Sequence, residues 1–142
     1  MTPSFYFRDY KPGDFSIVLN LWKQTGLGDE KRGDNEAVIL NTIKTGGKFI
    51  MMIESHSEQL IGTSWITNDH RRLYLHHFGI AKQFQGKGYS KPLLEESLKF
   101  AKKTGLQIKL EVHKNNTIAR RLYEKYAFKY LGDYLVYIIR AF

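Results

Sequence analysis

The sequence contains no cysteine, only three prolines and no apolar run long enough to span a membrane. Without cysteine, neither a disulfide bond nor a cysteine nucleophile is available. A transmembrane helix needs about 20 consecutive apolar residues, and the first residues lack the basic and apolar regions of a signal peptide. We therefore expect a cytoplasmic location and no membrane partner.

Acidic residues are also scarce, because 14 aspartates and glutamates stand against 22 lysines and arginines. The resulting formal charge of +8 favours anionic partners such as nucleotide phosphates, RNA or acidic proteins, without choosing among them. The 142 residues, 42% of them hydrophobic, are enough for one ordinary domain with a substantial core. No repeat or linker divides the chain, so we expect a single domain over residues 1–142.

The spacing of apolar residues and turns predicts the element order β-α-α-β-β-β-α-β-α-β-β. The expected strands are Phe5–Arg8, Lys48–Glu54, Gln59–Thr67, Arg72–Ile80, Leu106–His113, and the hairpin Phe128–Leu131 with Tyr134–Arg140. Helices are expected after caps at Asp14, Asp34 and Asn116 and after the loop Ala81–Lys87. Hairpins come first and a strand–helix–strand crossover follows, so the class is α/β (α+β) with a mixed central sheet flanked by helices.

The crossover contains the glycine loop, Gln83-Phe84-Gln85-Gly86-Lys87-Gly88-Tyr89-Ser90, which lies between a strand and a helix. In such folds ligands bind beyond the carboxyl ends of strands and beside a helix N-terminus. Two glycines spaced by one residue let the backbone approach a ligand closely. The N–H groups of the first helical turn and the helix dipole favour an anion there. The loop therefore has the properties of a pyrophosphate site, and an ordinary strand-to-helix turn is the alternative.

Two other phosphate-binding motifs fit this loop less well. A P-loop requires Gly-x-x-x-x-Gly-Lys-Ser/Thr, which the sequence lacks. A dinucleotide fingerprint requires a third glycine at the position where Lys91 stands. That fingerprint also usually opens the first strand–helix–strand unit, whereas this loop lies past the middle of the chain.

A second motif begins 28 residues after Gly88 and reads Asn116-Thr117-Ile118-Ala119-Arg120-Arg121-Leu122-Tyr123-Glu124-Lys125-Tyr126-Ala127-Phe128. Together with Gln83-x-x-Gly86-x-Gly88, it resembles the GNAT superfamily of N-acetyltransferases. That family carries Gln/Arg-x-x-Gly-x-Gly/Ala, then a strand, then Asn-x-x-Ala-x-x-Leu-Tyr-Glu-Lys-x-Gly-Phe. The resemblance covers the whole chain in element order and Gln83–Phe128 in motif. The opening around Leu21-Trp22 and the turn Asp69-His70-Arg71 also resemble a branch of small bacterial members.

Three positions depart from the family pattern. Lys82 stands where a proline is usual, Ser90 where a further small residue is often glycine, and Ala127 where glycine usually precedes Phe128. None of these changes removes a chemical group. If the backbone at Ala127 is left-handed, alanine costs on the order of 1 kcal/mol there.

The resemblance implies an acyltransferase that uses acetyl-coenzyme A (acetyl-CoA) as its cosubstrate. Backbone N–H groups from Gln85 to Ser90 would hold the pyrophosphate, and the strand end Phe78-Gly79-Ile80 would pair with the pantetheine arm. Asn116 would bond the cofactor, or simply cap its helix. The residues implied to bind acetyl-CoA are Phe78, Gly79, Ile80, Gln85, Gly86, Lys87, Gly88, Tyr89, Ser90 and Asn116.

The resemblance also implies two catalytic residues. Tyr123 would be the general acid, because a phenol of pKa ~10 can share its proton with a leaving thiol of pKa ~8.5; a core-packed tyrosine is the alternative. Glu111, in a segment similar to ribosomal-protein N-terminal acetyltransferases, would take a proton from the ammonium if partial burial raises its pKa. The alternative for Glu111 is a solvated strand residue.

His76 and His77 are rival bases, since imidazole titrates near neutrality. Adjacent strand residues face opposite sides, so we expect only one of the two to reach the cleft. The five histidines show no spacing typical of metal ligands, so no metal is expected.

The acceptor is expected to be a primary amine on a small molecule or a peptide. The segment between the first two helices usually borders the acceptor cleft in this family, and it offers an aromatic ring and carboxylates that suit a cationic amine. A solvated loop is the alternative. The residues expected at the acceptor are Trp22, Asp29, Glu30 and His77. A homodimer is left open.

Two other functions compete with this one. A non-catalytic acyl-CoA sensor on the same fold would bind the cofactor without turnover. An RNA-binding module would suit the positive charge, but it requires a basic patch with stacking aromatics or an RRM or KH motif, and the sequence contains no such motif.

Overall fold

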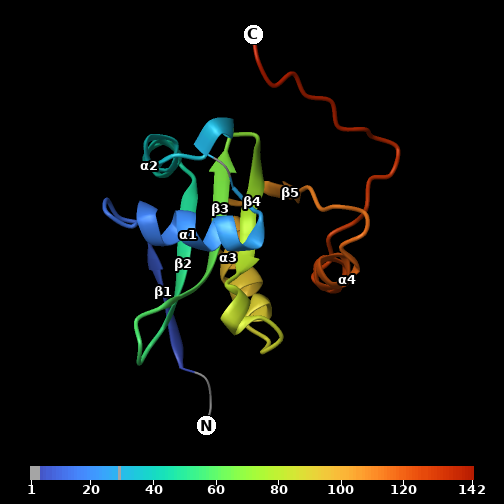
Figure 1. Cartoon of the computed structure of the whole chain (residues 1–142). Helices are drawn as coiled ribbons and strands as arrows, with labels where there is room; N and C mark the ends of the chain where they lie inside the picture. The colour runs from blue at the N-terminus through green and yellow to red at the C-terminus, as the bar shows by residue number, and fades with distance from the viewer. Residues whose placement is uncertain (1–3, 29) are drawn as a thin grey trace. The chain divides into compact units, whose positions relative to one another are not determined.

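The computed structural model describes residues 4–28 and 30–142. They form two compact parts, the first ending at Leu110 and the second beginning at Glu111. The first part contains one sheet in the order β1-β2-β3-β4-β5, antiparallel except for the parallel pair β4–β5 (Figure 1). Its strands are β1 Phe5–Asp9, β2 Lys48–Glu54, β3 Leu60–Asn68, β4 Arg72–Ile80 and β5 Gln107–Leu110. Its helices are α1 Phe15–Thr25, α2 Glu36–Lys44 and α3 Ser90–Thr104, with the 3-10 turns η1 Glu30–Arg32 and η2 Lys82–Phe84.

Helices cover both faces of this sheet, as two neighbouring residues of β3 demonstrate. Trp65 stacks on Trp22 of α1, with ring centroids 5.7 Å apart and an interplanar angle of 9°. Ser64 instead hydrogen-bonds Ser97 of α3 at 2.7 Å. Successive strand residues point to opposite faces, so α1 and α3 lie on opposite sides. The predicted mixed sheet with a crossover through α3 is confirmed.

One predicted helix cap is confirmed in position and another is wrong. Asp14 is the N-cap residue of α1, but its side chain makes no capping hydrogen bond. Its carboxylate accepts from the Arg8 guanidinium at 2.8 and 3.0 Å and from the Lys11 N–H at 2.9 Å. Asn35, rather than Asp34, caps α2 by accepting from the backbone N–H of Val38 at 3.0 Å. Asp34 is therefore not needed as a cap, and its carboxylate lies beside β4.

In the second part, the chain forms α4, Thr117–Lys125. Asn116 accepts from the N–H of Ala119 at 3.2 Å, so its predicted role as a cap is confirmed. The helix ends in a Schellman motif: the N–H of Phe128 donates to the Tyr123 carbonyl and that of Ala127 to the Glu124 carbonyl. Phe128 also packs edge-on against the Tyr123 ring at 5.6 Å, which is the apolar contact that usually accompanies this motif.

The predicted C-terminal hairpin is wrong. The described residues after Phe128 contain no strand, and their large apolar side chains, such as Tyr137 and Ile139, are exposed. The segment has the alternating apolar residues of a strand, but a two-stranded hairpin is at best marginally stable without a surface to pack on. The fifth predicted strand is also shorter than expected, because β5 ends at Leu110 and Glu111 follows it.

We predict that Ala127→Gly stabilises the protein by up to about 1 kcal/mol, measured by chemical denaturation. Ala127 has φ 71°, a left-handed conformation that is strained for alanine and relaxed for glycine. Ala119→Gly, inside α4, should be destabilising by about 1 kcal/mol. A destabilised Ala127→Gly variant would contradict this explanation.

No helix among the described residues is both long enough and apolar enough to cross a membrane.

Candidate functional site

The glycine loop joins β4 to α3 and carries a row of backbone donors. Gly86 and Gly88 have φ of 75° and 85°, a region that favours glycine. Among the described residues, no hydrogen bond uses the backbone N–H groups from Gly86 to Lys91. Several donors at the start of a 15-residue helix form a site with the polarity that binds anions.

Other residues of the loop hold it in place. The Gln85 N–H donates to the Lys82 carbonyl at 3.2 Å, and its side chain donates to the Ile80 carbonyl at 2.9 Å. The backbone N–H of Lys82 donates to Gln24 of α1 at 2.9 Å. Tyr89 is buried and packs edge-on against Phe84. Gln85 and Tyr89 thus support the loop, and the free donors start at Gly86.

A β-bulge lies near the end of β4, just before this loop. Trp65 of β3 is opposite His76 and Thr63 is opposite Gly79, so Ser64 faces two residues, His77 and Phe78. β5 pairs with β4 only as far as Leu75, so no strand among the described residues pairs with the outer edge of β4 beyond it.

Gly79 follows the bulge, in a position where a side chain would not fit. A Cβ atom there would lie 2.3 Å from Cδ1 of Leu27. The Thr63 hydroxyl fixes the bulge from the other strand, because it donates to the His77 carbonyl at 2.9 Å and accepts from the Trp22 indole at 3.1 Å. Sequence reasoning missed Thr63 and Leu27, because neither belongs to a motif.

The bulge changes the expected placement of the two histidines. His76 and His77 both contact the Trp65 ring, at centroid distances of 6.1 and 5.1 Å. The prediction that they face opposite sides of the sheet is therefore wrong, because the extra residue of the bulge shifts the alternation. His76 pairs with the Thr67 hydroxyl at 2.9 Å and stacks on Tyr74 at 4.0 Å.

The expected acceptor residues have different environments. Trp22 is completely buried, so it belongs to the core and offers no surface to an acceptor, contrary to expectation. Glu30 is exposed in η1, and Asp29 lies outside the described residues. His77 is largely covered, with 14% of its side chain exposed, and its Nε2 lies 3.1 Å from Oδ2 of Asp34.

The second part contains the other motif residues. Tyr123 is buried, and burial raises its pKa to about 12, so the phenol is protonated at neutral pH. Glu111 is exposed, whereas the expected base required partial burial. Asn116 is exposed at the start of α4, and its side-chain oxygen is occupied by the cap.

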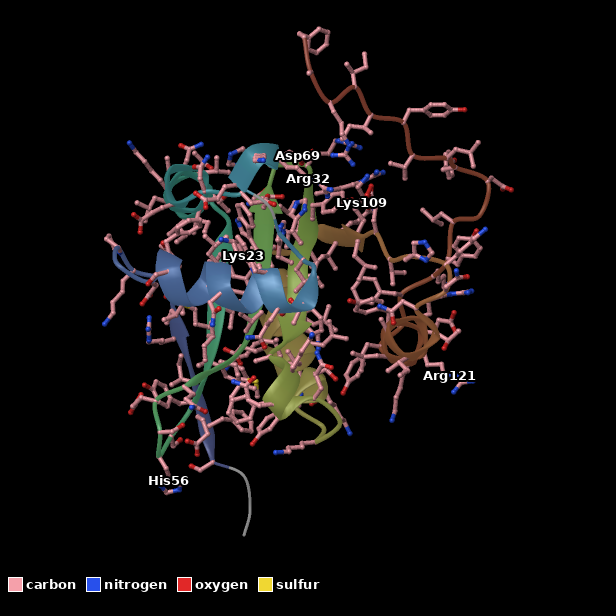
Figure 2. All side chains as sticks on the ribbon, viewed as in Figure 1. Lys23, Arg32, His56, Asp69, Lys109 and Arg121 are labelled. Atoms are coloured by element: carbon pink, nitrogen blue, oxygen red, sulfur yellow. The ribbon has the colours of Figure 1, made fainter. Side chains whose placement is uncertain are left out.

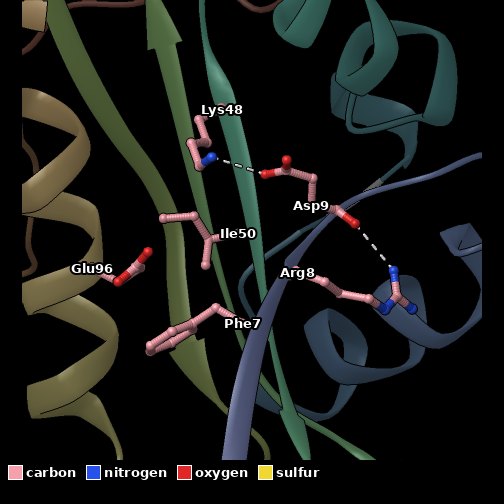
Figure 3. Close-up of a pocket in the computed structure, with 6 residues that line it drawn as sticks. All are labelled: Phe7, Arg8, Asp9, Lys48, Ile50 and Glu96. Atoms are coloured by element: carbon pink, nitrogen blue, oxygen red, sulfur yellow. Dashed lines mark hydrogen bonds and ion pairs between the residues drawn. The ribbon is translucent and has the colours of Figure 1, made fainter. Parts of the chain in front are cut away.

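A small pocket of about 130 Å³ lies elsewhere in the first part, between β1, β2 and α3 (Figure 3). Its lining residues are Phe7, Arg8, Asp9, Lys48, Ile50 and Glu96. Lys48 pairs with Asp9 at 3.0 Å, whereas the Arg8 guanidinium points away from Glu96 and pairs with Asp14. The pocket contains no residue of the glycine loop or of β4, so it is separate from the anion site.

Charge elsewhere in the first part is spread over several elements. Figure 2 shows Lys23, Arg32 and Lys109, which are exposed on α1, η1 and β5. In the described residues, no group of three histidine, aspartate or glutamate side chains could hold a metal ion.

The sequence profile of the acetyltransferase (GNAT) family matches residues 15–128. The chain belongs to the GNAT acetyltransferase family. The match includes the glycine loop and α4, and the predicted class of acyltransferase using acetyl-CoA is confirmed. No curated protein sequence matched the chain.

Solved structures of GNAT proteins share the fold. A predicted acetyltransferase from Clostridium acetobutylicum, solved with acetyl-CoA, is 17% identical, with a TM-score of 0.73 over 95% of this chain and 96% of that one. The ribosomal-protein-S18-alanine N-acetyltransferase of Escherichia coli is 15% identical, with a TM-score of 0.74 over 89% and 78%. The aminoglycoside antibiotic 6'-N-acetyltransferase of Acinetobacter baumannii is 14% identical, with a TM-score of 0.67 over 98% and 99%.

Proposed function

We propose that this GNAT chain transfers the acetyl group of acetyl-CoA to a primary amine by direct attack on the thioester. The observation that carries the proposal is the glycine loop, whose N–H groups from Gly86 to Lys91 have no acceptor among the described residues. A pyrophosphate supplies anionic acceptors for such donors, and the α3 dipole favours it there. Residues 1–142 act as one N-acetyltransferase domain in this proposal.

The edge of β4 beyond Leu75 suits an extended ligand that carries amide groups. The pantetheine arm is such a ligand, and strand-like pairing would engage the backbone of Phe78, Gly79 and Ile80. The bulge interrupts regular pairing with β3 at this point, and glycine at position 79 allows Leu27 to pack directly against the backbone. Asn116 would add a bond to the cofactor through its amide N–H groups, since its oxygen caps α4.

Two proton transfers accompany the reaction. Tyr123 would protonate the sulfur as the thiolate leaves, because its phenol is protonated throughout the neutral range. The ammonium of the acceptor must also lose a proton before it can attack. Glu111 is the base that the family resemblance suggests. His76 and His77, beside the bulge in β4, are the alternative bases.

The acceptor class is an amine on a small molecule or a peptide. The Escherichia coli relative is named for a protein alanine and the Acinetobacter relative for an aminoglycoside, so both kinds occur on this fold. The exposed carboxylate of Glu30 supports a cationic acceptor through its charge, and Asp29 adjoins it in sequence.

We predict that acetyl-CoA raises the melting temperature. Ligand at 100 times its dissociation constant stabilises by about 2.7 kcal/mol, or roughly 5–10 °C for a chain of this size. Thiol release should then be detected with at least one member of a panel of polyamines, aminoglycosides and peptides with free N-termini. A shift without thiol release from any amine would favour the non-catalytic sensor. Absence of any shift would contradict the proposal.

A further inference from the structure

His77 has an unusual environment for a strand residue. Its backbone φ is 44°, and its ring lies beside the stacked indoles of Trp22 and Trp65, tilted against both at centroid distances of 4.5 and 5.1 Å. Both ring nitrogens are covered from solvent, and neither makes a hydrogen bond among the described residues. The Asp34 carboxylate lies near the ring, with Oδ2 3.1 Å from Nε2.

Each of these features is costly for a residue that only fills the core. A left-handed backbone is uncommon for residues other than glycine, and such conformations are concentrated at functional sites. A covered nitrogen without a hydrogen bond loses its interaction with water. A leucine or phenylalanine at this position would pack against the two indoles without burying a nitrogen that lacks a hydrogen bond. The position is also specific, because His77 directly precedes the strand end proposed to pair with the pantetheine arm.

We infer that His77 is the base that deprotonates the acceptor amine, with Asp34 as its positioning residue. This inference rests on the proposed acetyl transfer. Asp34 favours a proton on Nε2, which leaves the lone pair on Nδ1. The carboxylate also stabilises the imidazolium that forms when Nδ1 takes a proton, as in a His–Asp catalytic pair.

The proton balance of the reaction is complete with these residues. Nδ1 of His77 takes one proton from the ammonium, and the neutral nitrogen then bonds to the thioester carbon. As the carbon–sulfur bond breaks, Tyr123 gives its proton to the sulfur and regains one from the new nitrogen–carbon centre. His77 releases its proton to solvent, so the products are the amide, the thiol and one proton.

The other candidate bases are less suitable. The Nε2 atom of His76 is engaged with the Thr67 hydroxyl, and its ring is stacked on Tyr74. Glu111 is exposed, and a solvated carboxylate is a weak base for an ammonium. The covered ring of His77 requires the amine to enter by displacing the segment Gly26-Leu27-Gly28, which packs against both Trp22 and Gly79.

The electrostatic surroundings of His77 define the expected pH dependence. The titratable groups that face it are Asp34, ahead of α2, and His76 on β4, while α1 and β3 present only indoles. The neutral ring is the active form, so kcat should fall on the acidic side as His77 becomes protonated. A pH profile of kcat with one acidic limb is therefore expected.

The test is the variant His77→Asn, since asparagine tolerates a left-handed backbone. It should keep the acetyl-CoA melting shift, lower kcat by about 100-fold or more and abolish the acidic limb. Asp34→Asn should cause a smaller loss. The matched control is His70→Asn, which alters another left-handed histidine, at φ 68° in an exposed turn, and should leave kcat unchanged.

A second variant separates catalysis from folding. His77→Gly relieves the backbone strain and leaves space for imidazole, so added imidazole should restore part of the activity. A His77→Asn variant with wild-type kcat and acidic limb would overturn the inference, as would loss of the acidic limb in Glu111→Gln alone. Wild-type protein that turns over no amine would instead overturn the proposed function.

Discussion

Replacing Tyr123 by phenylalanine should lower kcat by roughly 10²–10⁴-fold while acetyl-CoA still raises the melting temperature. The substitution removes only the phenolic oxygen and its proton. The ring that packs against Phe128 in the Schellman motif is kept, so α4 should remain folded. Thiol release under saturating acetyl-CoA and amine measures the effect.

The raised pKa of Tyr123 makes this prediction more specific. Between a phenol of pKa about 12 and a free thiol of pKa about 8.5, complete proton transfer is unfavourable by roughly 5 kcal/mol. The phenol should therefore act by donating a hydrogen bond as charge builds on the sulfur, in surroundings that also disfavour a bare thiolate. An acyl donor with a more acidic leaving thiol should lose less activity in Tyr123→Phe.

The matched control is Tyr126→Phe, which makes the same change three residues further along the chain. This variant should retain its activity. A Tyr123→Phe enzyme with full activity would show that the thiolate leaves unaided, whereas an unfolded variant would assign the tyrosine to the core. Burial of the neutral phenol also stabilises the fold below pH 10, and this contribution should be lost as the pH rises towards 12. In Tyr123→Phe, the free energy of unfolding should not show this loss between pH 10 and 12.

Gly86→Val and Gly88→Val should each abolish the melting shift caused by acetyl-CoA. Both glycines have positive φ, and valine at such an angle strains the backbone by about 1–2 kcal/mol. The loop would relax by turning its N–H groups away from their common direction. Apart from the adjoining residues of the loop, no atom of the described residues lies within 4 Å of a Cβ atom at either position, so steric conflict with them is not the cause.

This open space allows a matched control. Gly13→Val places the same side chain at another glycine of positive φ, 97°, where a Cβ atom would also meet nothing within 4 Å. It should lower the melting temperature of the free protein but leave the acetyl-CoA shift intact. If both loop variants keep a normal shift, the pyrophosphate does not bind at this loop.

Most elements of the fold could be predicted because their sequences carry local signals. The helical stripe of Val18, Leu21 and Trp22 and the glycine at position 26 define α1 and its end. The C-terminal segment carries an equally strong strand signal, but pairing depends on a partner that local sequence does not describe. A local cap signal does not describe competing partners either. It predicts the position of Asp14 correctly but not its pairing with Arg8, and it places the cap of α2 at Asp34, which lies beside His77 instead.

The candidate site was predictable only where a motif fixed it. The loop glycines and Asn116 belong to motifs, and their local conformations fit the expected roles. The position of the bulge could not be predicted. A single extra residue in β4 changes which face of the sheet the following side chains point to. Sequence spacing also gave no sign of two contacts at the bulge. These are the hydrogen bond from Thr63 and the pairing of Asp34 with His77.

The stacked pair of indoles provides an intrinsic fluorescence signal at the candidate site. Trp22 and Trp65 are the only two tryptophans in the sequence, and both rings contact His77. All the tryptophan fluorescence of the chain therefore originates beside the bulge. Imidazolium quenches indole emission more strongly than neutral imidazole, so protonation of His77 and occupation of the neighbouring strand edge should both change the signal. Ligand binding and proton uptake can then be timed in unlabelled protein.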